Sequence, residues 1–284
     1  MHFPNFKWIK ETHDACTVRG GSKYERNRGR IMLEVSHVTK KYGKTIACDD
    51  VSFTLESGSL TVLLGPNGAG KSTIMKSIIG FLKYSGTITV NGIPNKTSEA
   101  RKILGYIPEM PSLYPTLTVA EHMEFIARAY KLTDYKDRID QLLTRFELAD
   151  KKKKFGDELS KGMQQKLNLC LGLLPDPDIL LLDEPLLGLD PHAIKELKMM
   201  IEEMRQAGKT MLISTHIIDS VDMLWDKTVI MQNGQVKADI SKSDIEGMGK
   251  TLEDLFFEVT EGVSRDAVSE SSREETAEGN SGEA

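Results

Sequence analysis

The sequence predicts an α/β fold with a parallel-sheet core, an antiparallel β subdomain near the N-terminus and an inserted α-helical subdomain. Short aliphatic strands at Leu60–Leu64 and Ile179–Leu182 are each followed by a helix, which is typical of parallel sheets. Alternating strands and turn signals dominate before residue 105, and helical periodicity replaces them between about 110 and 175. The chain has no internal repeat, so we expect one α/β domain over residues 31–260.

The strand Leu60–Leu64 runs into a glycine-rich turn and a helix, and this stretch fits the phosphate-loop pattern G-x-x-x-x-G-K-[ST]. Its glycines allow a tight turn that brings backbone N–H groups against phosphate oxygens. We expect Lys71 to neutralise the β- and γ-phosphates and the Ser72 hydroxyl to ligate Mg²⁺. The alternative is a glycine-rich turn without a ligand. The expected nucleotide-binding residues are Gly65, Pro66, Asn67, Gly68, Ala69, Gly70, Lys71, Ser72 and Thr73.

The bulk composition excludes several classes of protein. The 284 residues can bury one large core or two small ones, and a net charge of −5 does not suit a protein that wraps nucleic acid. The widely separated Cys16, Cys48 and Cys170 are expected to be reduced thiols. No apolar run approaches the roughly 18 residues that span a bilayer, and we see no secretory signal. We therefore expect a cytoplasmic protein.

Both ends of the chain are expected to be disordered. Residues 1–30 lack hydrophobic periodicity and carry seven basic against three acidic side chains, and residues 261–284 carry seven acidic side chains against two arginines. Met32 is a second candidate start, which would make residues 1–31 an artefact of start-site assignment. N-terminal sequencing that found these residues in the native protein would reject this hypothesis.

The remaining elements follow from alternation, turn signals and helix caps. Asn91-Gly92 and Asn233-Gly234 are hairpin-turn signals, and Thr118-x-x-Glu121 is a capping box. The other expected strands are Ile31–Val35, Val51–Leu55, Thr87–Val90, Gly105–Ile107, Thr210–Ser214, Val229–Gln232 and Gln235–Ile240. The expected helices are Thr118–Tyr130, Tyr135–Phe146, Ser160–Leu174, Pro191–Ala207 and Leu252–Val259.

Two carboxylates end the buried strand Ile179–Leu182, at the edge where ligands bind in open α/β sheets. Because adjacent strand residues point in opposite directions, Asp183 can reach the Mg²⁺ shell while Glu184 faces the attacking water as general base. A strand that merely ends in a charged turn is the alternative. His216 follows another strand to the same edge, where it could bond the γ-phosphate or orient the water.

A further motif, L-S-K-G-M-Q-Q, covers Leu159–Gln165 and starts a helix. With the phosphate loop and the Asp-Glu pair, it makes the chain from about residue 31 to 260 resemble the ATP-binding subunit of an ABC transporter. The resemblance implies a P-loop NTPase with a RecA-like core that uses ATP and Mg²⁺. It also implies that Ser160 and Gly162 hold the γ-phosphate of ATP on a second ATPase subunit, in a homodimer that sandwiches two ATPs.

The resemblance assigns further roles to matching positions. Tyr42 resembles the aromatic that stacks on adenine, although it could also be a surface tyrosine in a turn. The segment Gly188-Leu189-Asp190 resembles the family's loop that communicates between the two sites, which implies a role for Asp190 there. His216 resembles the family's switch histidine.

Three positions depart from the family pattern. Glu109 replaces the glutamine that faces Mg²⁺ and the membrane subunit, so it keeps an oxygen ligand but adds a charge. Lys161 replaces a glycine, where it either adds positive charge toward the γ-phosphate or is solvated, and Met163 replaces a glutamine. With these departures, the sequence resembles the Ecs-type (ABC-2) exporter ATPases of Gram-positive bacteria.

The resemblance favours an exporter ATPase that works on a separate multi-span permease at the inner face of the cell membrane, with no nucleic acid. The candidate permease contacts are Glu109, Leu113, Tyr114 and Pro115, for which packing between subdomains is the alternative. A soluble ABC ATPase that acts on nucleic acid or the ribosome is the second hypothesis. Against it, no long coiled coil separates Lys71 from Ser160, and there is a single nucleotide domain. The third, an unrelated phosphate-loop kinase or GTPase, disagrees with the L-S-K-G-M motif.

Overall fold

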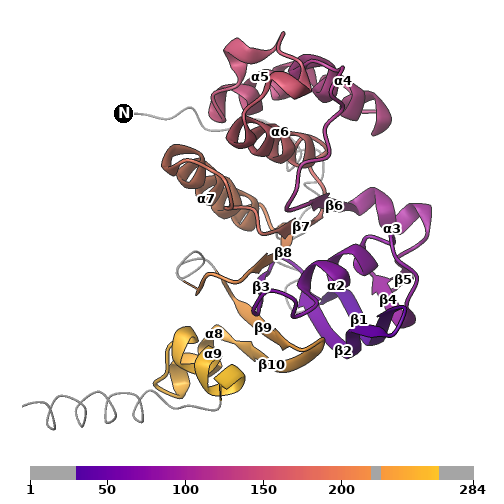
Figure 1. The fold of residues 1–284 in the computed structure, drawn as a ribbon, viewed down its shortest axis with the longest axis vertical. Coiled ribbons are helices and arrows are strands. Elements are labelled where there is room, and N and C mark those ends of the chain that lie inside the picture. The colour runs from indigo at the N-terminus through magenta and orange to yellow at the C-terminus, as the bar shows by residue number, and fades with distance from the viewer. Residues whose placement is uncertain (1–29, 219–224, 262–284) are drawn as a thin grey trace, which may run out of the picture.

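The computed structural model describes residues 30–218 and 225–261, which form two β-sheets and a group of helices (Figure 1). The core sheet has six strands, in the spatial order β10-β9-β3-β8-β7-β6. Their bounds are β3 Leu60–Leu64, β6 Leu104–Ile107, β7 Ile179–Asp183, β8 Thr210–Thr215, β9 Lys227–Gln232 and β10 Gln235–Ser241. The expected termini, 1–30 and 261–284, lie almost wholly outside the described residues.

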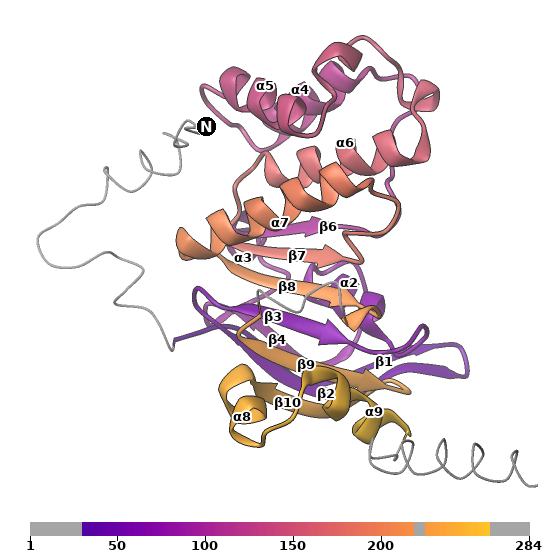
Figure 2. The same ribbon diagram turned by 90° about the vertical axis from the view of Figure 1, so that its left-hand side faces the viewer.

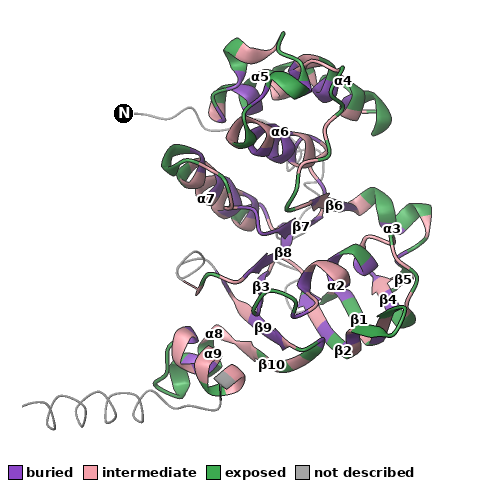
Figure 3. Ribbon diagram, viewed as in Figure 1, coloured by how far each residue is buried: buried purple, intermediate pink, exposed green. Residues whose placement is uncertain are grey.

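The core sheet is parallel from β6 to β9, and only β10 runs antiparallel to its neighbour. Every residue of β3, β7 and β8 is buried (Figure 3), because helices or the second sheet cover both faces. The β9–β10 hairpin turns at Asn233 and Gly234, both with positive φ, as its Asn-Gly sequence predicts. The expected parallel-sheet core is confirmed.

The second sheet is antiparallel, in the order β2-β1-β4-β5. Its strands are β1 Ile31–Tyr42, β2 Thr45–Glu56, β4 Ser85–Val90 and β5 Ile93–Pro94. The first two are much longer than the alternation predicts, because irregular register between Val35 and Lys40 lets the pair continue past the break in the pattern. This sheet confirms the antiparallel β subdomain.

The expected helical insertion is present as α4 Val119–Ala129, α5 Lys136–Arg145 and α6 Lys161–Leu173. The capping box of α4 forms as predicted: the Glu121 N–H donates to Thr118 Oγ1 at 3.2 Å, and the Thr118 N–H donates to Glu121 Oε2 at 2.7 Å. Figure 1 shows these helices at one end of the molecule, beyond β6. The insertion therefore projects from the core at the β6 edge of the sheet, whereas the described helices that follow β10 in the chain lie beside β10 at the opposite edge.

The remaining helices are α2 Lys71–Ile78, α3 Ser98–Ile103, α7 Pro191–Gln206, α8 Lys242–Gly247 and α9 Leu252–Glu261. Two of these, α3 and α8, were not expected, since six residues are too few to show helical periodicity. Both begin at a side-chain cap, from Thr97 and Ser241 respectively. None of the described helices is both long and apolar enough to cross a membrane.

Two hydrophobic clusters lie on opposite faces of the core sheet. Leu60, Val62 and Leu64 point into the cluster shared with α7 and the helical insertion, whereas Leu63 points into the cluster shared with α2 and the antiparallel sheet. Figure 2 shows the core strands side by side, with α6 and α7 along one face. Because β3, β7 and β8 pair in parallel, their carboxyl ends lie at one edge of the sheet.

Candidate functional site

The phosphate loop spans residues 65–70, between the end of β3 and the start of α2. Gly68 and Gly70 have φ values of +81° and +102°, which L side chains rarely adopt. A Cβ at Gly65 would lie 2.3 Å from the carbonyl oxygen of Met231, and one at Gly70 would lie 2.4 Å from that of Ala47. The glycines are therefore required by the loop's own packing, and they leave its N–H groups free of side-chain cover.

Lys71 is buried at the first position of α2, with an exposed fraction of 6%. Its ammonium donates to the carbonyl oxygens of Gly65 at 2.6 Å and Pro66 at 3.3 Å, and lies 3.5 Å from a Glu184 carboxylate oxygen. The loop thus holds a largely buried ammonium group against two of its own carbonyl oxygens. A buried positive charge of this kind is suited to receiving an anionic ligand.

Asp183 ends β7 and is almost fully buried. Its Oδ1 accepts hydrogen bonds from the hydroxyls of Ser72 at 3.1 Å and Ser214 at 2.5 Å, and its Oδ2 accepts one from the Tyr106 hydroxyl at 3.2 Å. Burial, and then the neighbouring Asp183 charge, raises the pKa of Tyr106, so the phenol remains a donor. Sequence reasoning missed Tyr106 and Ser214, although each lies within two or three residues of a predicted site residue.

Glu184 lies just beyond the end of β7 and has a φ of +46°. Asp183 and Glu184 do diverge as expected, but through this left-handed residue rather than through strand alternation alone. The Glu184 N–H donates to Ser214 Oγ at 3.1 Å, and Glu184 Oε1 lies 2.9 Å from His216 Nδ1. Two neighbouring strands therefore hold the carboxylate and the imidazole together.

A pocket of about 650 Å³ collects most of the predicted site residues. The part of its lining that comes from Asn67–Thr73 faces Glu184 and His216, and Tyr42 and Glu109 complete the wall. Tyr42 is half exposed, and Lys40 Nζ lies 4.7 Å from its ring centroid without lining the pocket. The sequence did not single out two further lining residues, Ala47 and Leu187.

Ser160, Gly162 and Asp190 lie together outside this pocket. Ser160 caps α6 and accepts a hydrogen bond from the Met163 N–H at 3.3 Å, and a Cβ on Gly162 would lie 3.3 Å from the Gly188 carbonyl oxygen. Asp190 caps α7, and its carboxylate lies 2.7 Å from Lys166 Nζ; the hydrogen bond from Lys166 lowers the pKa of Asp190. The L-S-K-G-M motif thus packs on the loop before α7, not on this chain's own phosphate loop.

The candidate permease contacts divide into two kinds. Leu113 packs on the hydrophobic cluster of the insertion, whereas Glu109, Tyr114 and Pro115 are exposed. The Tyr114 ring lies edge to face with Phe125, at 5.8 Å between centroids, and Phe125 is itself half exposed. An aromatic surface therefore lies beside the loop that carries Glu109.

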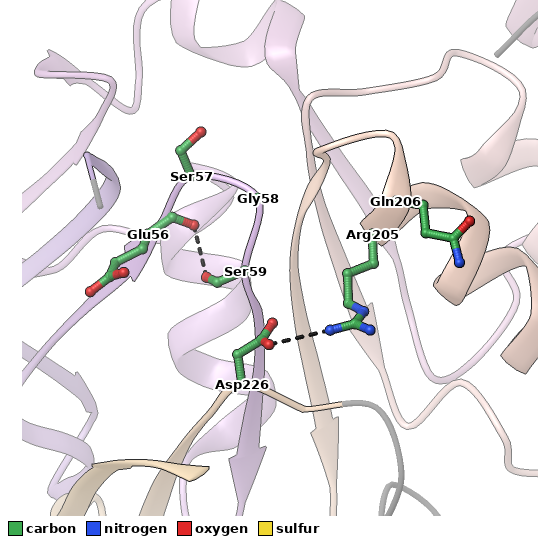
Figure 4. Close-up of a pocket in the computed structure, with 7 residues that line it drawn as sticks. All are labelled: Glu56, Ser57, Gly58, Ser59, Arg205, Gln206 and Asp226. Atoms are coloured by element: carbon green, nitrogen blue, oxygen red, sulfur yellow. Dashed lines mark hydrogen bonds and ion pairs between the residues drawn. The ribbon is translucent and has the colours of Figure 1, made fainter. Parts of the chain in front are cut away.

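A second pocket, of about 440 Å³, lies at the start of β3 near the C-terminal end of α7 (Figure 4). Its one cationic lining residue among those described, Arg205, is already paired, with Asp226 of the lining at 3.4 Å and with Glu202 outside it at 2.9 Å. No predicted site residue lines it. The phosphate-loop pocket is therefore the candidate site.

The fold and the site define a class. A parallel sheet with a phosphate loop after one strand and a buried Asp-Glu pair after another is a P-loop nucleotide-binding fold. The ABC transporter family model matches residues 48–187. The ATP-binding protein EcsA of Bacillus subtilis (strain 168) is 37% identical over 238 residues, which cover 81% of this chain and 96% of that protein. The chain therefore belongs to the ATP-binding proteins of ABC transporters.

Two further comparisons agree. The Nod factor export ATP-binding protein I of Sinorhizobium fredii (strain NBRC 101917 / NGR234) is 35% identical over 215 residues, covering 74% of this chain and 63% of that protein. A solved ATP-binding subunit of an ABC transporter superposes with a TM-score of 0.75 at 37% identity, covering 80% of this chain and 99% of that one. The chain is thus an ABC-type ATPase coupled to transport, a subunit of a complex with transmembrane components.

Proposed function

We propose that this chain is the MgATP-hydrolysing subunit of an exporter and that it acts as a homodimer on a separate multi-span permease at the inner face of the cell membrane. The observation that carries the proposal is the division of the predicted residues. The phosphate loop, Glu184 and His216 line one pocket, whereas Ser160 lies at an exposed helix start outside it. A second copy can supply Ser160 to this pocket, and this chain's Ser160 can serve the second copy.

The chemistry of the donors fits Mg²⁺. Ser72 and Asp183 contribute oxygen atoms only, 3.1 Å apart, and oxygen ligands are the ones that Mg²⁺ prefers. Glu109 lines the same pocket and adds a third oxygen donor. The metal would neutralise negative charge that develops on the phosphates. We assign Ser72, Asp183 and Glu109 to it.

The chain's own residues then divide the work of hydrolysis. Lys71 binds phosphate in exchange for its bonds to the carbonyls of Gly65 and Pro66. Glu184 accepts the proton of the attacking water as general base, and His216, 2.9 Å away, orients that carboxylate. Tyr42 stacks on adenine at the mouth of the pocket.

The exposed aromatic surface supports a protein partner. Met110, Tyr114 and Phe125 are 78%, 54% and 50% exposed, and large exposed apolar side chains that cluster mark interaction sites. Met110 follows Glu109 directly and Tyr114 lies in the same segment, so a permease segment bound there would touch the loop of a proposed metal ligand. Export is supported by the departures at Glu109 and Lys161, and by the relative whose name states Nod factor export.

Purification of the tagged chain from its native membranes in mild detergent tests the proposal. We expect a protein with several membrane spans to co-purify and to stimulate ATP turnover when the pair is reconstituted. If no multi-span protein co-purifies, and if nuclease treatment removes whatever does, the result would instead support a soluble ABC ATPase that acts on nucleic acid or ribosomes.

A further inference from the structure

Tyr106 lies on β6, the edge strand of the core sheet, three residues before Glu109. Its backbone pairs with Leu181 of β7, so the ring is fixed close to the Asp-Glu pair that follows that strand. The side chain is only partly buried. It therefore has one end in the site and the other near the surface.

The buried end is the hydroxyl. It donates to Asp183 Oδ2 at 3.2 Å, whereas the two serine hydroxyls bond to Oδ1. Tyr106 is therefore the described donor on the second carboxylate oxygen and fixes the plane of the carboxylate. Hydrogen-bond partners that orient a metal ligand commonly change metal affinity by about 10- to 100-fold when removed.

The outer end is the ring. It lies edge to face with Phe81, with the centroids 6.1 Å apart and an interplanar angle of 83°. Phe81 follows α2 and is 70% exposed. Phe81 is mostly exposed to water but packs on the ring of Tyr106, whose hydroxyl bonds to Asp183. These two contacts connect the surface to Asp183.

We propose that Tyr106 is a positioning residue that joins the exposed Phe81 surface to the Asp183 carboxylate and thereby sets how strongly the site binds metal-nucleotide. This inference rests on the proposed MgATP function. It adds that the packing of Phe81 on the Tyr106 ring helps to hold the hydroxyl on Oδ2.

The test is the Mg²⁺ dependence of nucleotide binding, measured with a fluorescent ATP analogue at increasing Mg²⁺ and in EDTA. Tyr106→Phe removes only the hydroxyl. We expect the Mg²⁺ concentration for half-maximal binding to rise about tenfold, with metal-free binding within twofold of wild type. Tyr84→Phe is the matched control, because that partly buried hydroxyl bonds to Asn95 at 2.6 Å, away from the site. It should leave both quantities unchanged.

A second variant tests the outer end. Phe81→Ala should raise the half-maximal Mg²⁺ concentration by about two- to tenfold, since an aromatic pair contributes roughly 0.5–1.5 kcal/mol, and should add nothing in the Tyr106→Phe background. Unchanged Mg²⁺ dependence in Tyr106→Phe, or an equal loss of metal-free binding, would overturn the inference. If the wild-type chain itself shows no Mg²⁺-dependent binding, the proposed function fails instead.

Discussion

The phosphate-loop region and the L-S-K-G-M region share one chemistry but differ in how complete they are. In the first, Lys71, Asp183 and Glu184 are each less than 9% exposed. Lys71 pairs with Glu184 and bonds to the loop, Asp183 bonds to Ser72, and Lys71, Ser72 and Glu184 line one pocket. In the second, Ser160 and Lys161 are exposed at the start of α6, and no acidic residue lies in its first turn. One region is an enclosed pocket, and the other is an exposed surface at a helix start.

The two regions also differ in what holds them in place. Arg145 of α5 bonds to Glu196 and Glu203 of α7 at 2.9 Å and 2.8 Å, and Lys166 of α6 lies between Asp190 and Glu147. These ion pairs fix the helical insertion to α7 on the core. The start of α6 is therefore held against α7 by these ion pairs and by the hydrophobic cluster that the two helices share, not by the phosphate loop of its own chain.

The largest effect is expected for Glu184→Gln. Loss of a general base lowers turnover by about 10²- to 10⁴-fold, and removal of a negative charge beside Lys71 should keep nucleotide affinity at or above that of wild type. Steady-state ATPase assays with equilibrium binding measure both. Glu99→Gln, at an exposed position in α3, is the control and should hydrolyse normally. Wild-type turnover in Glu184→Gln would refute the general-base assignment.

Next in size is Lys71→Ala. Loss of a charge-assisted bond to phosphate costs about 1.5–3 kcal/mol, so we expect ATP affinity to fall by about 10- to 100-fold in isothermal titration. Lys76→Ala, on the exposed face of the same helix, should bind as wild type does. Equal affinities for the two variants would show that Lys71 does not bind phosphate.

The smallest effect is expected in the L-S-K-G-M region, for Ser160→Ala, which should lower turnover about tenfold and leave the nucleotide affinity of the single protomer unchanged. Ser241→Ala removes the corresponding cap of α8 and should cost similar stability without affecting turnover. Should Ser160→Ala weaken nucleotide binding by an isolated protomer, the two regions would not be halves of a shared site.

The sequence predicts the elements that depend on local chemistry. The phosphate loop, the α4 capping box, the Pro191 start of α7 and both Asn-Gly turns rest on neighbouring residues, and the structure has each of them. Register irregularities that extend β1 and β2 depend on the partner strand, and α3 is too short to show periodicity. These were not predictable from local patterns.

The site residues also divide into those predictable from local motifs and those that depend on the order of the strands. Predicted residues such as Lys71 and Glu184 belong to motifs that run along the chain. Tyr106 and Ser214 reach Asp183 from two strands on either side of β7, so their roles depend on sheet order. Lys71 also bonds back to the Gly65 carbonyl, which no residue pattern encodes.

The central claim is that two protomers grip the nucleotide between Ser72 of one and Ser160 of the other. The most direct measurement is the mass of ATP-loaded Glu184→Gln protein by light scattering after gel filtration, with and without the membrane subunit. We expect an ATP-dependent dimer that Ser160→Arg abolishes. A protein that stays monomeric under both conditions, while still binding ATP, would contradict the account.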